Sequence, residues 1–260
     1  MDHRPSEFVQ SLERGLSVIR AFDGDHPELT LSEVANRTGL TRAAARRFLI
    51  TLESMGYVRS RNRRFSLRPA VLELAHSYLS SMNLPEIAMP HLESLAAQVE
   101  AASSISVLDR KDIVYVARVA TKKIMAVNIN VGTRFPAAAT SMGRAILACL
   151  PAAELEDQLR DLRLEARTPH TITDVGRLRQ ELDRVRAQGW CLLDQELEVG
   201  LRALAAPIRD AAGYPVAAIN VSIPLLAQSV EEIIANFLEP VLGRVSAIEQ
   251  DLRATGFARD

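Results

Sequence analysis

The side chains of this sequence that are best suited to binding chemistry are arginines, and they are concentrated in one short stretch. Residues 37–68 contain nine arginines and one acidic residue, Glu53, which gives this stretch a net charge of +8. The complete sequence of 260 residues has a formal net charge of only −1, because residues 1–36 carry −4 and residues 69–260 carry −5. A guanidinium group is planar and makes paired hydrogen bonds with phosphate or guanine, so this composition favours DNA as the ligand. The alternative is a charged surface that only interacts with water.

Two short helices joined by a tight turn are predicted to position the arginines. The residues Thr30-Leu31-Ser32-Glu33 fit a capping box that opens a helix running to about Arg37. A turn over residues 38–40 follows, in which Gly39 suits a positive φ angle. Thr41 is then predicted to cap a second helix that runs to about Met55. Two helices connected in this way are typical of a helix-turn-helix motif.

The second of these helices is predicted to be amphipathic. The side chains at positions 45, 48, 49 and 52 are apolar and would pack into a core. Arg42, Arg46 and Arg47 lie near the opposite face, in the first half of the helix. This arrangement would offer guanidinium groups to a DNA groove while the other face packs against the protein.

Two short strands after this helix are predicted to form a hairpin with a basic tip, typical of the wing in a winged helix. They cover residues 57–60 and 64–67. In helix-turn-helix proteins the start of the second helix meets the base edges, where the small Ala43 and Ala44 would allow close approach. The hairpin arginines would meet phosphates or the minor groove. The predicted DNA-binding residues are Arg14, Thr30, Thr41, Arg42, Ala43, Ala44, Arg46, Arg47, Arg61, Arg63 and Arg64.

Further helices flank this basic module. Periodic apolar residues predict a helix over residues 7–22 before it and another over residues 69–81 after it. A third helix, over residues 85–100, contains Pro90 and is expected to kink or to begin afresh there. The helix over residues 69–81 is interpreted as a linker or dimerisation helix, and a simple core helix is the alternative.

Beyond residue 103 the sequence predicts an antiparallel sheet flanked by helices. The predicted strands cover residues 104–108, 113–117, 125–131, 190–194, 203–209 and 215–222. The predicted helices cover residues 141–150, a polar segment after residue 151, residues 174–188 and residues 229–254. The expected fold class is therefore α+β. A winged helix-turn-helix domain is expected over residues 7–68, a linker helix over residues 69–82 and a second domain over residues 83–257.

Several other classes of protein are not supported by the sequence. Charges interrupt the apolar runs well before the roughly 20 residues of a membrane span, and the polar N-terminus has no signal-peptide core. Cys149 and Cys191 are isolated, so no disulfide framework or cysteine-rich zinc site is expected, and the cytoplasm is the expected location. The motifs GxSxG, HExxH, GxGxxG and the phosphate-binding loop are absent, which argues against an enzyme and against a cofactor. Asp194, Glu196 and Glu198 could hold a metal together with a histidine, but this spacing is more typical of a solvated loop, so no metal is expected.

Six stretches of the chain carry short motifs, namely Ser11–Leu16, Gly39–Leu52, Gly56-Tyr57, Thr140–Ala145, Gly200–Arg202 and Ala205–Ile208. Together they resemble the IclR family of bacterial transcriptional regulators, and the resemblance extends from about Phe8 to Leu252. Within the family the sequence is most similar to the branch that controls aromatic-acid catabolism, the PcaR, PcaU and PobR regulators of the β-ketoadipate pathway. The stretches that indicate this branch cover residues 40–49, 104–109, 115–119 and 131–137.

The resemblance implies an N-terminal winged helix and a C-terminal GAF-like domain that binds a small effector. It also implies homodimers, often paired as tetramers, on repeated half-sites of double-stranded DNA. In this branch the effectors are protocatechuate, 4-hydroxybenzoate or β-ketoadipate, and both activators and repressors occur. Other members have polar groups at the positions of Ala203 and a hydroxyl at that of Asn220, so the resemblance leaves the ligand's identity open. The effector pocket is implied at Thr140, Ser141, Met142, Asp194, Ala203, Asn220 and Ser222.

The chemistry of these residues independently supports a pocket. Asn220 and Ser222 are two residues apart on a predicted strand and so face the same side, although an exposed sheet face would give the same pattern. Ser141 begins a helix, whose first N–H groups favour an anion such as a carboxylate. Arg118 and Arg134 are candidate carboxylate partners, with surface or subunit contacts as the alternative.

The sequence therefore predicts a ligand-responsive DNA-binding regulator of aromatic-acid catabolic genes. Two alternatives remain open. One is a regulator of the same family that responds to a different small carboxylic acid. The other is a DNA-binding protein whose C-terminal domain only oligomerises.

Overall fold

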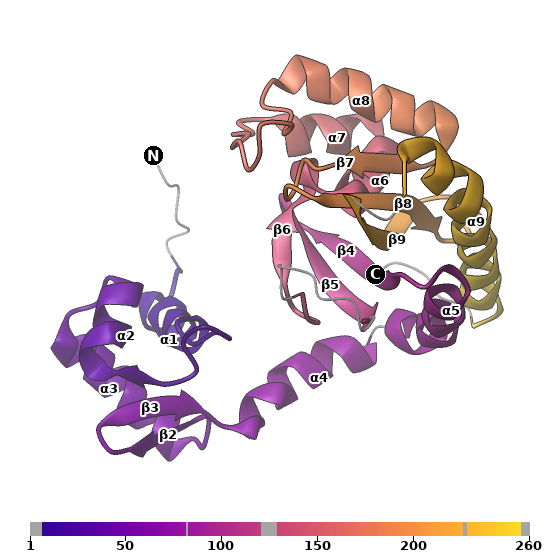
Figure 1. Ribbon diagram of the computed structural model, residues 1–260. Helices are drawn as coiled ribbons and strands as arrows, with labels where there is room; N and C mark the ends of the chain where they lie inside the picture. The colour runs from indigo at the N-terminus through magenta and orange to yellow at the C-terminus, as the bar shows by residue number, and fades with distance from the viewer. Residues whose placement is uncertain (1–6, 82, 121–128, 226–227, 256–260) are drawn as a thin grey trace. The chain divides into compact units, whose positions relative to one another are not determined.

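The computed structural model describes residues 7–81, 83–120, 129–225 and 228–255. The chain divides into two compact units, Met1–Ser81 and Met82–Asp260, and each unit contains its own antiparallel sheet (Figure 1). Helices and antiparallel strands are combined in both units, which confirms the predicted α+β class.

The first unit is a helix-turn-helix completed by a small sheet. Its elements are α1 (Gln10–Arg20), β1 (Leu29–Thr30), α2 (Leu31–Thr38), α3 (Arg42–Ser54), β2 (Val58–Arg61) and β3 (Arg64–Leu67). The three strands are antiparallel and follow the order β1-β3-β2. The apolar faces of the helices meet the sheet in a core that includes Val18, Val34, Leu49 and Val58, each fully buried.

The predicted caps of α2 and α3 are confirmed. The Thr30 hydroxyl accepts a hydrogen bond from the Glu33 N–H at 3.3 Å, and the Glu33 carboxylate accepts one from the Thr30 N–H at 2.7 Å. Gly39 ends α2 with a φ of 67°, a left-handed conformation that glycine adopts without steric penalty. The Thr41 hydroxyl then caps α3 by accepting from the Ala44 N–H. These local bonds fix the direction in which α3 leaves the turn.

The wing is a tight hairpin that the short strand β1 extends. Asn62 and Arg63 have φ angles of 51° and 62°, so Arg61 pairs directly with Arg64 across a two-residue turn. The sequence did not predict β1, which pairs with β3 through Thr30 and Arg64. This pairing connects the hairpin to Thr30, the N-cap residue of α2.

The segment predicted as a helix over residues 69–81 contains a 3-10 helix (Pro69–Val71) followed by α4 (Leu72–Ser81). Leu72, Leu74 and Tyr78 on α4 are 69%, 50% and 49% exposed. Apolar side chains with this exposure do not belong to the core of their own unit, which argues against the core-helix alternative.

The second unit is built on a six-stranded antiparallel sheet of order β6-β5-β4-β9-β8-β7. Its central pair joins β4 to β9, so the first hairpin of the unit lies beside the last one. A register shift in β4 between Ile105 and Ser106 locally disturbs the pairing with β5. The strands are β4 (Ala102–Asp109), β5 (Asp112–Val119), β6 (Arg134–Pro136), β7 (Cys191–Asp194), β8 (Leu201–Arg209) and β9 (Pro215–Pro224).

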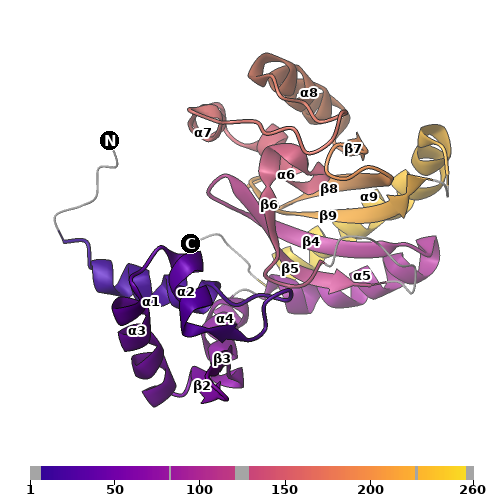
Figure 2. The ribbon, with the colours of Figure 1, turned by 60° about the vertical axis from the view of Figure 1, so that its left-hand side comes forward.

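Helices cover both faces of this sheet, which gives the unit three layers (Figure 2). On one face α5 (Leu84–Val99) packs against α9 (Val230–Ala254) and both contact the sheet. On the other face α6 (Ser141–Cys149) crosses β8 and β9 and contacts α7 (Ala152–Leu159) and α8 (Val175–Gln188). Every face of the sheet is therefore covered, and the pocket described below lies on the α6 side.

The second unit departs from the sequence-based expectations at two strands, and it excludes one of the two alternatives for a helix. The strand predicted over residues 125–131 falls largely outside the described residues, and residues 129–131 are not in a strand. The short strand β6 was not predicted and pairs with β5. Helix α5 continues through Pro90 from Leu84 to Val99, so it does not begin afresh at the proline.

A close backbone approach fixes the start of α6. The 3-10 turn Ala137–Ala139 precedes the helix and packs against Gly143. A Cβ atom at Gly143 would lie 2.1 Å from the Ala137 carbonyl oxygen, so only glycine permits this contact. The approach places the first residues of α6 directly over the sheet.

Candidate nucleic-acid interface and ligand pocket

The solvent-facing side of α3 carries its arginines, as predicted. Arg42, Arg46 and Arg47 are exposed, whereas Ala45 and Leu49 are fully buried against the rest of the unit. Thr41 and Ala43 are also exposed and Ala44 is half-buried. The first half of α3 therefore presents three cations and small side chains on an accessible surface, which is the arrangement that a helix inserted into a major groove requires.

The wing presents a second group of exposed cations. Arg61, Arg63 and Arg64 are all exposed on β2, β3 and the turn between them. Arg64 lies 4.0 Å from the Glu33 carboxylate at the surface, and its guanidinium also reaches the Glu28 carbonyl. A surface ion pair at this distance is weak and leaves the guanidinium able to contact a phosphate.

Glu53, the single acid of the basic stretch, holds the wing against α3. Its carboxylate accepts a hydrogen bond from the Ser60 N–H at 3.0 Å. On the same hairpin, Arg59 Nε donates to the Ser66 hydroxyl at 2.9 Å. The Glu53 contact fixes the position of the hairpin relative to α3, and the Arg59 contact joins the two strands of the hairpin.

Two further predicted DNA-binding residues lie around this surface. Arg14 on α1 is exposed and shares a groove with Ala44, Arg47 and Phe48 of α3. Thr30 is half-buried, and its hydroxyl accepts the capping hydrogen bond of α2. Arg14 therefore extends the cationic surface, whereas Thr30 has a structural role that is compatible with contact to a phosphate.

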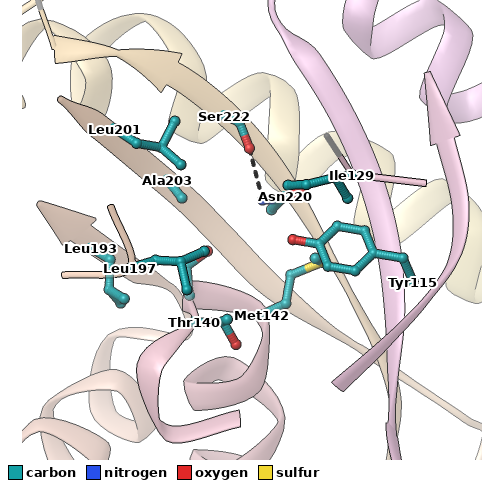
Figure 3. A pocket seen from close by; sticks show the side chains of 11 residues that line it. Tyr115, Ile129, Thr140, Met142, Leu193, Leu197, Leu201, Ala203, Asn220 and Ser222 are labelled. Carbon is teal, nitrogen blue, oxygen red and sulfur yellow. Dashed lines mark hydrogen bonds between the residues drawn. The ribbon is translucent and has the colours of Figure 1, made fainter. Parts of the chain in front are cut away.

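A pocket lies between α6 and the sheet of the second unit (Figure 3). The space between its walls, with the open mouth included, is about 380 Å³. Most of its walls are apolar, with a small number of polar groups. The residues that line it are Tyr115, Ile129, Thr140, Ser141, Met142, Leu193, Leu197, Leu201, Ala203, Asn220 and Ser222.

The N-terminus of α6 forms one side of this pocket. Thr140 caps the helix, since its hydroxyl accepts from the Gly143 N–H at 3.1 Å. Ser141 and Met142, the first two residues of the helix, both line the pocket. The partial positive charge of a helix N-terminus therefore faces the ligand space and favours an anionic group there.

The opposite side of the pocket is formed by Asn220 and Ser222 on β9 (Figure 3). They are 3% and 4% exposed, so the alternative of an exposed sheet face is wrong. The Asn220 amide donates through Nδ2 to the Ser222 hydroxyl at 3.2 Å. The Asn220 Oδ1 atom is buried and has no hydrogen-bond partner among the described residues.

Tyr115 of β5 supplies a further polar group of the pocket. Its side chain is 3% exposed, and burial raises the pKa of its hydroxyl to about 12. The hydroxyl group therefore keeps its proton at neutral pH and points into the pocket, toward the side formed by Asn220 (Figure 3).

Three residues that were predicted for the pocket are not among those that line it. Arg134 forms ion pairs with Asp109 at 2.5 Å and Asp112 at 3.2 Å at the exposed end of the β4–β5 hairpin. Arg118 is half-buried and donates to the Ser104 hydroxyl at 3.0 Å. Asp194 pairs with Arg202 across β7 and β8 at 2.8 Å, and this guanidinium lowers the pKa of the Asp194 carboxyl.

Alternation along β7 explains why Asp194 is not in the pocket. Successive side chains of a strand point to opposite faces, so Leu193 lines the pocket while Asp194 faces Arg202. Of the residues implied by the family resemblance, Thr140, Ser141, Met142, Ala203, Asn220 and Ser222 do line the pocket.

A buried ion pair that the sequence did not predict supports the wall of the pocket. Arg144 on α6 is 1% exposed and makes two hydrogen bonds with Glu196, at 2.7 and 2.6 Å. Glu196 directly precedes Leu197, which lines the pocket. A charged residue inside the apolar run of α6 was the available signal, because a buried arginine requires a partner.

The acidic side chains at the end of β7 and in the turn that follows it form ion pairs with arginines. Asp194 and Glu196 have Arg202 and Arg144 as partners, respectively. Among the described residues, no group of three or more histidine, cysteine or acidic side chains is placed to hold a metal ion. In the same part of the chain, no helix has both the length and the apolar character needed to cross a membrane.

Two family descriptions match the sequence. "IclR helix-turn-helix domain" matches residues 11–62, and "Bacterial transcriptional regulator IclR C-terminal" matches residues 76–250. The chain belongs to the IclR family of bacterial transcriptional regulators. The IclR helix-turn-helix match covers α1, α2 and α3, so the basic surface described above is that of a DNA-binding module.

Relatives of the IclR family are similar over most of the chain. The "Pca regulon regulatory protein" of Pseudomonas putida is 44% identical over 237 residues, which is 91% of this chain and 81% of the relative. The "p-hydroxybenzoate hydroxylase transcriptional activator" of Acinetobacter baylyi is 37% identical over 222 residues, 84% of this chain and 82% of the relative. Both are named as regulators, which agrees with the prediction of a regulator over an enzyme.

Solved structures of the family agree with this fold. A crystal structure from Rhodococcus sp. RHA1 is 52% identical, with a TM-score of 0.84 and coverage of 95% of this chain and 100% of the other. An IclR homologue of Microbacterium hydrocarbonoxydans complexed with 4-hydroxybenzoate is 26% identical, with a TM-score of 0.82 and coverage of 94% and 99%. The predicted winged helix, followed by a domain with an antiparallel sheet flanked by helices, is thus the fold of this family.

Proposed function

We propose that this chain regulates aromatic-acid catabolic genes in response to a small aromatic or dicarboxylic acid. The observation that carries the proposal is the pocket between α6 and β9. It combines apolar walls with a helix N-terminus and a few buried polar groups, in the same chain as a cationic recognition helix. Such a pocket suits an apolar body with one anionic group.

The named relatives support the aromatic-acid class. One is a regulator of a Pca regulon, a second activates transcription for p-hydroxybenzoate hydroxylase, and a related structure holds 4-hydroxybenzoate. Apolar side chains such as Leu193, Leu197 and Ile129 offer suitable contacts for an aromatic ring.

The proposed DNA contacts follow from exposure and charge. Thr41, Arg42, Ala43, Ala44 and Arg46 face the base edges of a major groove. The remaining proposed contacts, at phosphates or in the minor groove, are Arg14, Thr30, Arg47, Arg61, Arg63 and Arg64.

We further propose that the domains span residues 7–68, 69–82 and 83–257, with the helix α4 as linker. The exposed apolar side chains of α4 support a role in joining two copies of the chain, because exposed apolar surface favours association. A homodimer, paired as a tetramer, would place two recognition helices on repeated half-sites of double-stranded DNA. The proposed location is the cytoplasm, where the DNA is.

Thermal unfolding of the full chain in the presence of candidate acids tests the ligand proposal. A ligand at a hundred times its dissociation constant stabilises the folded state by about 2.7 kcal/mol, which raises the melting temperature by roughly 5–10 °C. The acids are 4-hydroxybenzoate, protocatechuate and β-ketoadipate, and glucose and acetate serve as controls. If none of the three acids raises the melting temperature more than the controls do, the sensor function is refuted.

A further inference from the structure

Arg202 on β8 joins a wall of the pocket to the start of α9. Its guanidinium donates through Nε and Nη2 to the Asp194 carboxylate at 2.8 and 3.2 Å, and through Nη1 to the Gln228 carbonyl at 2.6 Å. Gln228 directly precedes Ser229, the N-cap residue of α9. The Arg202 side chain is only 14% exposed, so these charge-assisted hydrogen bonds are partly shielded from water. One side chain therefore connects β7, β8 and the segment that leads into α9.

This ion pair lies on the face of the sheet opposite to the pocket. Arg202 stands between Leu201 and Ala203 in β8, and both of these neighbours line the pocket. Asp194 likewise follows Leu193 of β7, which is another pocket residue. Because side chains alternate along a strand, Arg202 and Asp194 point to the other face, where α9 contacts β8. A ligand that displaces the pocket side chains of β7 and β8 therefore moves the strands that carry the ion pair.

The segment before α9 follows β8 through two contacts of its backbone. The Leu225 N–H donates to the Gly200 carbonyl at 2.7 Å, and the Gln228 carbonyl accepts from Arg202. The Gln228 side chain is less well satisfied, because its buried Oε1 atom has no hydrogen-bond partner among the described residues. An unpaired buried acceptor raises the free energy of this arrangement, which brings an alternative position of the segment closer in free energy.

Helix α9 connects this segment to α5. It contacts both β8 and α5, and near its end Asp251 pairs with His91 of α5 at 2.8 Å. Helix α5 begins at Leu84, close in sequence to the end of α4 at Ser81. A shift at the start of α9 is thereby passed to the helix that follows the proposed linker in the chain.

We propose that Arg202 is a positioning residue that couples occupancy of the pocket to the position of α9, and thereby to transcription. This inference rests on the proposed function and adds the route by which the ligand signal leaves the pocket. Arg202 itself does not line the pocket, because its side chain lies on the far face of the sheet. Its loss should therefore spare ligand affinity and reduce the response, a combination that general damage to the fold does not produce.

Calorimetry on the full chain and reporter transcription from the DNA beside its gene test this inference together. The probe ligands are 4-hydroxybenzoate, protocatechuate and β-ketoadipate. The variant Arg202→Met keeps an unbranched side chain and removes all the donors. Its Kd for an acid that binds the wild type should stay within about threefold, whereas the change in transcription should fall from roughly fivefold or more to less than about twofold. Its affinity for the DNA without ligand should match that of the wild type.

Arg179→Met is the matched control. Arg179 of α8 makes a two-point ion pair with Glu156 of α7 in the same unit, and neither residue lines the pocket. This variant should keep both the ligand affinity and the transcriptional response of the wild type.

Hydrogen exchange reports the coupling in the wild type without any substitution. Binding of an acid should change the exchange rates of amides in residues 230–240, the first turns of α9, by roughly threefold or more. The same change should be lost in Arg202→Met, although the acid still binds.

The outcomes separate this inference from the proposed function. A full response in a folded Arg202→Met variant overturns the coupling and leaves the sensor function standing. A loss of ligand affinity that accounts for the whole loss of response also overturns it, because Arg202 would then only maintain the pocket. If Arg202→Met does not fold, exchange in the wild type decides, and unchanged rates in α9 on binding refute the coupling. Binding of none of the three acids contradicts the proposed function itself, and the coupling falls with it.

Discussion

Arg144 and Glu196 form a two-point ion pair that joins α6 to the wall of the pocket. The Arg144 guanidinium donates to the two carboxylate oxygens at 2.7 and 2.6 Å, and its Nε donates to the Ala138 carbonyl at 2.8 Å. The Glu196 carboxylate also accepts from the Ile172 N–H at 3.0 Å. One buried arginine thus links the turn before α6, the helix and the segment that carries Leu197.

Loss of this pair should destabilise the second unit strongly. Glu196→Ala leaves the Arg144 charge buried without a partner, so we expect the free energy of unfolding to fall by about 3–5 kcal/mol in urea titrations. Glu156→Ala is the matched control, because Glu156 makes the same two-point contact with Arg179 but both side chains are exposed. Its effect should be much smaller, because water screens an exposed ion pair. Equal effects of the two variants would show that burial does not decide the strength of the Arg144 pair.

Gly143 should not tolerate a methyl group. Gly143→Ala would place a Cβ atom 2.1 Å from the Ala137 carbonyl oxygen, so α6 must shift away from the turn that precedes it. We expect the free energy of unfolding to fall by about 3 kcal/mol or more. Gly243→Ala in α9 meets no atom within 4 Å and should raise stability by up to about 1 kcal/mol. A neutral Gly143→Ala variant in thermal or urea unfolding is incompatible with the described packing.

Arg46→Ala should weaken DNA binding without unfolding the protein. Arg46 is exposed on α3, so its removal leaves the core of the first unit intact. A base contact of this kind contributes about 1–3 kcal/mol, which corresponds to roughly a 5- to 150-fold loss of operator affinity in fluorescence anisotropy. Arg253→Ala, at an exposed position of α9, serves as the control and should bind as the wild type does. Unchanged operator affinity of Arg46→Ala would remove this residue from the interface.

The two cysteines should differ in reactivity. Burial raises the pKa of the Cys191 thiol to about 12, so below that pH the folded protein holds it as the unreactive neutral form. The unfolded chain exposes the same thiol with a pKa near 9.0, so its stabilising contribution is present below pH 9 and declines as the pH rises toward 12. In a Cys149→Ser variant at pH 8, Ellman's reagent should react with no thiol until denaturant is added. Rapid reaction of the folded variant would contradict the buried position of Cys191.

Local signals in the sequence predicted most of the elements. The capping box at Thr30 and the glycine at position 39 define the helix-turn-helix by bonds between neighbours in the chain. The alternation of Asn220 and Ser222 correctly placed both on one face of β9. These features could be found because periodicity and caps depend on residues close together in sequence.

Features that depend on distant pairing were missed or misplaced. The strands β1 and β6 are only two and three residues long and exist through pairing with β3 and β5. Arg134 was predicted for the pocket, but the β5–β6 pairing places it beside Asp109 and Asp112. The spacing of Asp194, Glu196 and Glu198 is typical of a solvated loop, whereas Glu196 pairs with Arg144 from 52 residues earlier in the chain. Single-residue types do not reveal such partners.

The central claim is that one chain couples recognition of an aromatic acid to control of transcription. The direct measurement is reporter transcription from the DNA beside the gene of this protein, in a host that lacks other family members. With the wild-type chain, at least one hydroxylated aromatic acid should change transcription roughly fivefold or more, as expected for a coupling of about 1 kcal/mol or more. The change should disappear in the Arg46→Ala variant and without the chain. Transcription that responds to none of these acids, or that responds equally without the protein, would contradict the account.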